Sequence, residues 1–572
     1  MGTSPAATSP SPFSRAEFHV EQLLDLYGFA SVVLHAAELL ARTALLGGVV
    51  FWVALALPLA RLLPPGDATR LRRIGRGAVL WAAVASLLCI LLTTTLSLGA
   101  LAASLDVPVA SLLGADFMRA AAVTFIATLL IYALALGPDQ AGPARRWGLL
   151  AAALAVLIGA TAGSHAIART EARPMLLAAT GLHQLGAALW IGGLPALLAS
   201  FRLTPASARR VGRRYSTFAA LGVGLILLGI LGYWFGYIGS VEAVYGTAYG
   251  AMSGTKGILL GLLLLLGGSN WLLLHRLTAG EEGLLRVRRF VEAEIAIGIA
   301  VLAVAASLTS VPPASDLPDD RVSWAEVVER FTPAWPRLES PNHADLAIPH
   351  LQAQLDAEWQ QRQAAQAQKP QAFTPGEGLL PPRNAQDIAW SEYNHHWAGL
   401  MVLLVGLAAL LDATGRVPLA RHWPLVFIGL AGFIFLRSDP EAWPLGEIGL
   451  LESLRDPEVV QHKLAGLLVV GFAVTEWWVR LGRIRGRARY VFPLAMVAGG
   501  VLLLAHTHAI SNVKEQLLVE LSHLPLAVLA VIGGCARFTE LRGPEALSRI
   551  ARWIWPVCLI LIGILLILYR EA

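Results

Sequence analysis

Residues 257–268 read GILLGLLLLLGG, an apolar run that lacks the alternation of polar and apolar residues typical of membrane β-barrel strands. The run lies inside a longer apolar stretch, about 252–275, and a helix needs about 20 such residues to cross roughly 30 Å of hydrocarbon. The whole chain has the same character, because 56% of its 572 residues are hydrophobic and 15% are charged. This composition excludes an ordinary soluble enzyme and predicts an all-α polytopic integral membrane protein.

Fourteen such stretches predict fourteen transmembrane helices in two bundles of eight and six. The predicted spans are about 41–62, 77–103, 113–137, 147–165, 174–200, 217–238, 252–275, 290–311, 396–413, 421–437, 462–481, 489–506, 517–538 and 552–569. We expect four parts in the chain. They are an outer N-terminal segment with an amphipathic approach helix (1–40), an eight-helix domain (41–311), an extracytoplasmic linker (312–393) and a six-helix, His-rich domain (394–572).

Basic residues mark one side of the predicted membrane, because cytoplasmic loops carry an excess of Lys and Arg. With fourteen spans, the Arg-rich loops all fall on one side, for example the loops with Arg70–Arg76, Arg209–Arg214 and Arg483–Arg489. Both termini and the linker are then predicted to be extracytoplasmic. The N-terminus has no basic segment followed at once by an apolar core, so we expect no cleaved signal peptide.

Several kinds of chemistry are excluded by what the chain lacks. A formal charge of +5 is too small to indicate a nucleic-acid partner, and no GxxxxGK[ST] loop indicates a nucleotide partner. The cysteines Cys89, Cys535 and Cys558 lie in separate apolar stretches without a CxxC motif, so neither a disulfide framework nor a thiolate metal site is expected. No GxSxG or HExxH pattern indicates hydrolysis. We therefore favour a transporter or a metal-binding protein over an enzyme.

Histidines gather at the predicted outer ends of the spans. The candidate metal ligands are His35, His165 and His183 in the first bundle, and His396, His462, His506, His508 and His523 in the second. Imidazole binds copper, zinc and haem iron, and thioether binds copper, which adds Met118 and Met175 as weaker candidates. The alternative is that such residues are interface anchors or packing residues, and we favour this for His19, His343, His350, His395 and the methionines.

Charged residues accompany some of these histidines. His35, Glu38 and Arg42 are spaced so that they share one helical stripe. Metal-bound imidazole usually donates its second N–H to a carboxylate or a carbonyl. Glu392, Glu458 and Glu520 lie near the histidines of the second bundle and are candidates for that role, although charges at helix ends that are solvated by water would look the same.

The fifth span reads LHQLGAALWIGGLPALL (182–198), which resembles the signature of the copper resistance protein D family (CopD/PcoD). Three further segments are similar to that family in the same order: SHA (164–166), TAYGAMSGTKGILLGLLLLLGGSNWLLLHRL (247–277) and VEAEIAIGIAVLAVAASLTSVPPA (291–314). The resemblance covers about residues 28–314. It implies a bacterial inner-membrane copper protein that moves copper inward or takes it from periplasmic partners, with His165 and His183 as its site residues and His35 as a weaker match.

The second bundle resembles a C-terminal extension of some copper-resistance membrane proteins, and its histidines also resemble those of b-type cytochrome bundles. The sequence therefore favours copper import or transfer from the periplasmic side, with copper ion, the lipid bilayer and a periplasmic copper-binding protein as partners. Two alternatives stay open. One is a redox protein with haem b in the second bundle, which would reduce copper, and the other is an assembly factor that delivers copper to an oxidase.

Overall fold

The computed structural model describes residues 12–105, 107–276, 281–318, 321–346, 385–446, 448–454, 457–505 and 513–571, with side chains from residue 30 onward apart from short gaps. The described residues form helices and contain no strand, which confirms the all-α fold class. His506 and His508 lie outside the described residues, as does the middle of the predicted linker.

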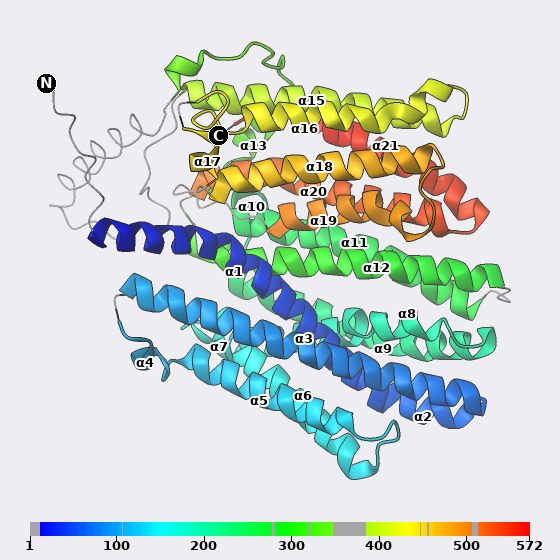
Figure 1. Ribbon diagram of the computed structural model, residues 1–572. Coiled ribbons are helices and arrows are strands. Elements are labelled where there is room, and N and C mark those ends of the chain that lie inside the picture. The colour runs from blue at the N-terminus through cyan, green and yellow to red at the C-terminus, as the bar shows by residue number, and fades with distance from the viewer. Residues whose placement is uncertain are drawn as a thin grey trace, which may run out of the picture.

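The first bundle contains long helices separated by short turns (Figure 1). In chain order its elements are α1 (Pro12–Val50), the π-helical η1 (Phe51–Ala56), α2 (Leu57–Leu59), η2 (Ala60–Leu62), α3 (Pro65–Leu105), α4 (Val109–Leu112), α5 (Asp116–Leu136), α6 (Pro143–Ala162), η3 (His165–Ile167), α7 (Arg173–Ala187), η4 (Ala188–Gly192), α8 (Leu194–Ser200), α9 (Pro205–Tyr233), η5 (Trp234–Ile238), α10 (Val241–Gly246), α11 (Ala248–His275), α12 (Glu281–Ser307) and η6 (Leu308–Ser310).

The linker and the second bundle follow. Their elements are η7 (Ala314–Asp316), α13 (Trp324–Phe331), η8 (His343–Asp345), α15 (Ala385–Ala413), η9 (Pro418–Leu425), α16 (Val426–Arg437), α17 (Leu450–Ser453), α18 (Pro457–Arg480), η10 (Gly486–Tyr490), α19 (Val491–Ala505), α20 (Val513–Arg542) and α21 (Glu545–Ile567). In Figure 1, α11 and α12 lie between the rest of the first bundle and α18–α20 of the second.

Within the described residues, thirteen helices are long and apolar enough to cross a membrane, and each coincides with a predicted span. The predicted span 462–481 coincides with α18, which lies beside α16 and α19 in Figure 1 but is not among the thirteen. Several helices begin well before their apolar run, for example α9 at Pro205, because proline at the first helical position fits the start of a helix. α1 is continuous across the boundary that we predicted at residue 40.

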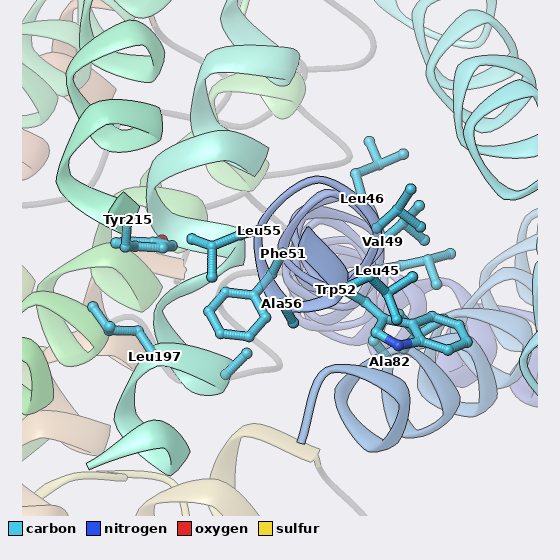
Figure 2. Close-up of a cluster of buried hydrophobic side chains, with 14 of the residues drawn as sticks. Leu45, Leu46, Val49, Phe51, Trp52, Leu55, Ala56, Ala82, Leu197 and Tyr215 are labelled. Carbon is cyan, nitrogen blue, oxygen red and sulfur yellow. The ribbon is translucent and has the colours of Figure 1, made fainter. Parts of the chain in front are cut away.

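The first span lies at the centre of its bundle. Its most apolar window is 78% buried, against 50% or less for the other twelve. Figure 2 shows the reason, since side chains on opposite sides of this helix meet different neighbours. Trp52 and Leu45 lie on the side of Ala82 from α3, whereas Phe51 lies on the side of Tyr215 from α9. This part of the helix is apolar on nearly every side because neighbouring helices cover most of its surface.

The arginines that predicted the orientation lie at one end of the bundle, where they bind carbonyl groups at the ends of neighbouring helices. Arg76 donates to Gly137 O at 2.7 Å, and Arg213 donates to Leu274 O at 2.6 Å. Such carbonyls have no partner within their own helix and attract cations. These contacts bring the predicted basic loops of the first bundle together at the same end.

The two bundles share one apolar cluster, in which Met252 and Leu259 of α11 pack with Leu524 and Ala527 of α20. Ser307 Oγ also donates to Leu504 O at 2.7 Å. The described part of the linker crosses the opposite end from the basic loops. There Arg169 forms a two-pronged ion pair with Asp316, with N–O distances of 2.5 and 2.8 Å. The division into four domains stays a prediction.

Candidate functional site

The WIGG stretch (190–193) of the fifth span lies where two helix backbones are in close contact. α7 ends in the π-helical turn η4, which ends at Gly192. A Cβ on Gly192 would lie 2.0 Å from Thr43 O of α1, and a Cβ on Gly47 would lie 2.3 Å from the carbonyl carbon of Gly192. Only glycine fits at such a distance. The motif therefore fixes α7 against the central helix, nine residues beyond His183.

His183 lies where α7 meets α9. A Cβ on Gly229 of α9 would lie 2.7 Å from His183 Cβ, and a Cβ on Gly232 would lie 2.5 Å from Ala179 Cβ. Small residues let helices in a membrane approach closely. Because both positions are glycines, the α9 backbone packs directly against the face of α7 that carries the His183 imidazole.

The His183 ring has one bonded nitrogen and one bare nitrogen. Its Nδ1 atom is buried and has no hydrogen-bond partner among the described residues. The ring hydrogen-bonds the backbone of Ile226, and because Nδ1 is bare we place the N–H on Nε2. The Tyr233 ring lies 5.3 Å away, centroid to centroid. Metal-bound histidines commonly have this arrangement, in which a carbonyl holds the second N–H and fixes the tautomer.

A lysine influences this ring. Lys256 of α11 is half-buried and interacts electrostatically with His183. An ammonium group near an imidazole opposes the arrival of a second cation. The sequence interpretation missed Lys256, although an ionisable residue inside an apolar span is a functional candidate by default.

Nearer the outer end, His35 forms part of a polar cluster on α1. Glu38 accepts hydrogen bonds from Arg42 at 3.1 Å and from Thr93 of α3 at 2.9 Å. His35 interacts electrostatically with Glu38, with Arg42 and with His165. The stripe predicted for α1 therefore forms, and His165 of η3 lies near enough to His35 to interact with it electrostatically.

His165 opens η3 at the outer end and is exposed. Although the residue is exposed, neighbouring protein atoms partly desolvate its ring, and this desolvation lowers its pKa below the ordinary value of 6.5. Its imidazole is therefore neutral, and able to bind a metal, over a wider pH range than that of a free histidine.

The two predicted methionines lie at the outer starts of their helices. Met118 is half-buried near the start of α5, and Met175 is 37% exposed near the start of α7. No described contact joins either thioether to a histidine. Met252, which the sequence interpretation did not select, is 1% exposed and lies one turn from Lys256 on α11.

In the second bundle, backbone groups occupy both ring nitrogens of His396. Nδ1 accepts a hydrogen bond from the backbone N–H of Arg337 at 2.7 Å, and Nε2 donates to Tyr569 O at 2.8 Å. His396 is 4% exposed, and its two hydrogen bonds connect the linker and the C-terminal segment to α15. A metal could bind this ring only if one of these hydrogen bonds broke.

The neighbouring His395, which we expected to be an interface anchor, points toward other polar rings instead. It stacks on Tyr569 with ring centroids 3.8 Å apart, and the centroid of His523 from α20 lies 6.2 Å away. His395 Nδ1 donates to Ser391 O at 2.8 Å. The structure thus brings His523 and His395 together, and among the described residues these two histidine rings lie closest to each other at the outer end of this bundle.

His462 binds a carboxylate. Its Nδ1 lies 2.6 Å from Asp439 Oδ1, and Lys463 Nζ lies 3.1 Å from Asp439 Oδ2. Burial raises the pKa of Asp439, but hydrogen bonds from His462, Ser438 and Lys463 outweigh it and bring the pKa down to about 2. Asp439 is therefore a carboxylate partner of a predicted ligand that the sequence did not suggest, whereas the side chain of Glu458 lies outside the described residues.

Across the described residues, no group of three or more His, Cys, Asp or Glu side chains is arranged to hold a metal ion. The structure therefore offers single imidazoles and pairs, and the predicted rim of five histidines does not appear as one cluster in the described part. The predicted convergence of His506 and His508 with His396, His462 and His523 stays a prediction, because residues 506–512 lie outside the described part.

Residues 209–308 match the family model of Copper resistance protein D, and this range includes Gly229, Lys256 and the 247–277 motif. The chain is also 35% identical over 136 residues to the Copper transport protein CutJ of Bacillus subtilis (strain 168). That match covers 23% of this chain and 24% of CutJ. No solved structure matches the chain. Over residues 209–308 this membrane protein is therefore similar to the copper resistance protein D family, as its motifs predict.

Proposed function

We propose that the protein binds copper ions at its extracytoplasmic end and passes them inward along the first bundle. His35 and His165 would receive the ion, and His183 would hold it deeper in the membrane. The observation that carries the proposal is the bare, buried Nδ1 atom of His183. An unpaired buried nitrogen is costly unless a ligand completes it.

A site that consists of one or two imidazoles suits an ion that must be released to the next site. A site along a transport path must bind strongly enough to capture the ion and weakly enough to release it. The outer pair lies on α1 and η3, and both of these elements contact α7, which carries His183. The Arg42–Glu38 ion pair beside His35 is internally neutral, so it adds no net charge against an entering cation.

We also propose the direction of copper movement and the membrane in which the protein lies. The basic loops would face the cytoplasm of a bacterial inner membrane, and the histidines and both termini would then be periplasmic. A periplasmic copper-binding protein would deliver the ion to the surface formed by η3 and the linker. The division at residues 41–311 and 394–572 would separate this copper path from the second bundle.

The test is copper binding and uptake by the full-length protein in lipid nanodiscs and proteoliposomes. His183→Ala should reduce copper affinity by about 10-fold or more, as expected for the loss of a ligand. His275→Ala is the matched control, because that histidine lies at the opposite end of the same bundle and bonds Trp271 O of its own helix at 2.8 Å. Equal copper binding by wild type and His183→Ala would refute the proposal.

The visible spectrum of the same reduced protein separates copper handling from the haem alternative. Copper bound without a reduced haem band supports the proposal. A sharp reduced haem band would instead favour a b-type haem between histidines of the second bundle.

A further inference from the structure

Three glutamates of the described residues are almost fully buried within the helices, and they differ in their partners. Glu294 is 2% exposed, Glu476 is 1% exposed and Glu520 is 4% exposed. Glu476 accepts hydrogen bonds from Arg480 and Arg537, each at 2.8 Å. Burial of a carboxylate is expensive unless a cation or several hydrogen bonds compensate it. The two guanidinium groups explain why Glu476 can stay charged, and no guanidinium group of the described residues pairs with Glu294.

Glu294 lies on α12 and receives neutral donors. Asn270 Nδ2 of α11 donates to its Oε2 at 3.2 Å, and the Trp190 indole N–H of η4 donates to the same carboxyl group. Gly267 leaves the necessary space, since a Cβ there would lie 3.0 Å from Glu294 Oε1. Asn270 Oδ1 is buried beside it without a hydrogen-bond partner among the described residues. This amide is 6% exposed, so the unpaired acceptor is a costly feature that a ligand would relieve.

The charged groups on the neighbouring helices form ion pairs with residues other than Glu294. No Lys, Arg or His of the described chain lies within 4.0 Å of the Glu294 carboxylate. Arg42 of α1 pairs within its own helix, and Arg542 of α20 pairs with Glu292 at 3.4 Å. Tyr215 of α9 is the titratable side chain that interacts with Glu294, and its hydroxyl donates to Trp190 O.

We propose that Glu294 is a proton-binding site inside the first bundle, with Asn270 and Trp190 as its positioning residues. Two N–H donors stabilise the carboxylate, whereas burial without a cation favours the neutral acid, so the group can take up and release a proton. Asn270 Oδ1 is the acceptor available for the acid proton after rotation of the amide. Oxygen and neutral N–H groups suit a proton and are poor ligands for copper(I), which prefers softer donors.

The proton site also has a place in the proposed function. Trp190 lies seven residues beyond His183 along the same span, so the two sites follow one another toward the basic end of the bundle. A cation that reaches this part of the protein would favour release of the Glu294 proton by electrostatic repulsion. This coupling rests on the proposed copper function, whereas the proton site itself does not.

Infrared difference spectroscopy of the full-length protein in nanodiscs tests the proton site without copper. Between acidic and alkaline buffer, wild type should show the C=O stretching band of a protonated buried carboxylic acid. Glu294→Gln should lose that band or one component of it, and Glu476→Gln should retain the component. A folded Glu294→Gln protein with an unchanged band would overturn the proposal.

Chemical labelling of wild type keeps the test valid if the variant does not fold. Dicyclohexylcarbodiimide modifies protonated carboxyl groups in apolar surroundings. Mass spectrometry should find the adduct on Glu294 and not on Glu476, and no adduct on Glu294 would overturn the proposal.

The coupling to copper is tested last, by adding copper in the infrared experiment. If the Glu294 band changes in wild type and not in His183→Ala, the coupling is supported, and if wild type does not respond, the coupling alone fails.

Discussion

A Cβ atom on Gly229 would lie 2.7 Å from the Cβ atom of His183, so the backbone of α9 runs directly against the proposed copper ligand. The ring therefore has little freedom to turn, and its bare Nδ1 stays inside the bundle. Position 229 decides where this imidazole points, although it carries no side chain.

Gly229→Ala should displace His183 and weaken copper binding by about 10-fold or more, the scale reported for loss of a group that orients a metal ligand. The added methyl should also cost about 1–3 kcal/mol in stability, because it overpacks the contact between α7 and α9. Gly224→Ala is the matched control, since a Cβ at Gly224 has no heavy atom within 4 Å. Isothermal titration with copper compares the two. Equal affinities would show that α9 does not position the ring.

Lys256→Met should raise the affinity for copper. The ammonium group repels a cation at His183, and in the partly dehydrated bundle we take this repulsion to be about 1 kcal/mol or more, which corresponds to about fivefold in affinity. Lys256→Arg keeps the charge and should leave the affinity near that of wild type. Copper titration of the three proteins checks this. A lower affinity in Lys256→Met would indicate that the lysine supports the site instead of opposing it.

The spans could be predicted from the sequence because a long apolar run has few alternatives to a membrane helix. The helix starts could not, since polar residues such as those after Pro205 extend α9 into the aqueous side, where hydropathy carries no signal. The sequence also showed that His183 lies inside a span. The neighbours Gly229 and Lys256 could not be assigned to it, because they come from helices that meet only in the folded chain.

His395 and His396 show the same limit at the scale of one residue. They are adjacent on α15, so their side chains differ by about 100° around the helix axis. One ring meets His523, and the other meets the backbone of Arg337 and Tyr569. The linker and the C-terminus decide which ring is enclosed by backbone groups, and neither has a hydropathy pattern that reveals where it packs.

Copper capture should continue below the pH at which a free histidine is half protonated, about 6.5. The pKa of His165 is lowered by desolvation, so protons compete with the metal for this ring at a more acidic pH than for an ordinary imidazole. Binding should therefore fall as the pH drops, with a midpoint below that of a model imidazole. A pH series of copper titrations measures it, with His165→Ala as the reference. Copper binding that does not change with pH down to about 4 would argue against imidazole ligands.

Asp439→Asn should destabilise the second bundle by about 3 kcal/mol, because it leaves the buried Lys463 ammonium without its carboxylate. The Asp439 side chain is 3% exposed and the Lys463 side chain is 7% exposed, so solvent cannot replace the lost partner. The pKa of Asp439 is lowered to about 2 in the folded protein, which is below its ordinary value of 3.8. Its contribution to stability is therefore full above about pH 4 and is lost as the pH falls toward 2.

Thermal unfolding in detergent at neutral pH measures this loss, with Asp116→Asn as the control. Asp116 pairs with Arg119 at 3.5 Å, but both side chains are more than 70% exposed, so that substitution should leave the melting temperature nearly unchanged. His462→Ala separates the two partners of Asp439. It keeps the Lys463 ion pair and removes one hydrogen bond, so its effect should be smaller than that of Asp439→Asn. Equal losses in His462→Ala and Asp439→Asn would mean that the imidazole, and not the ammonium, makes this carboxylate necessary.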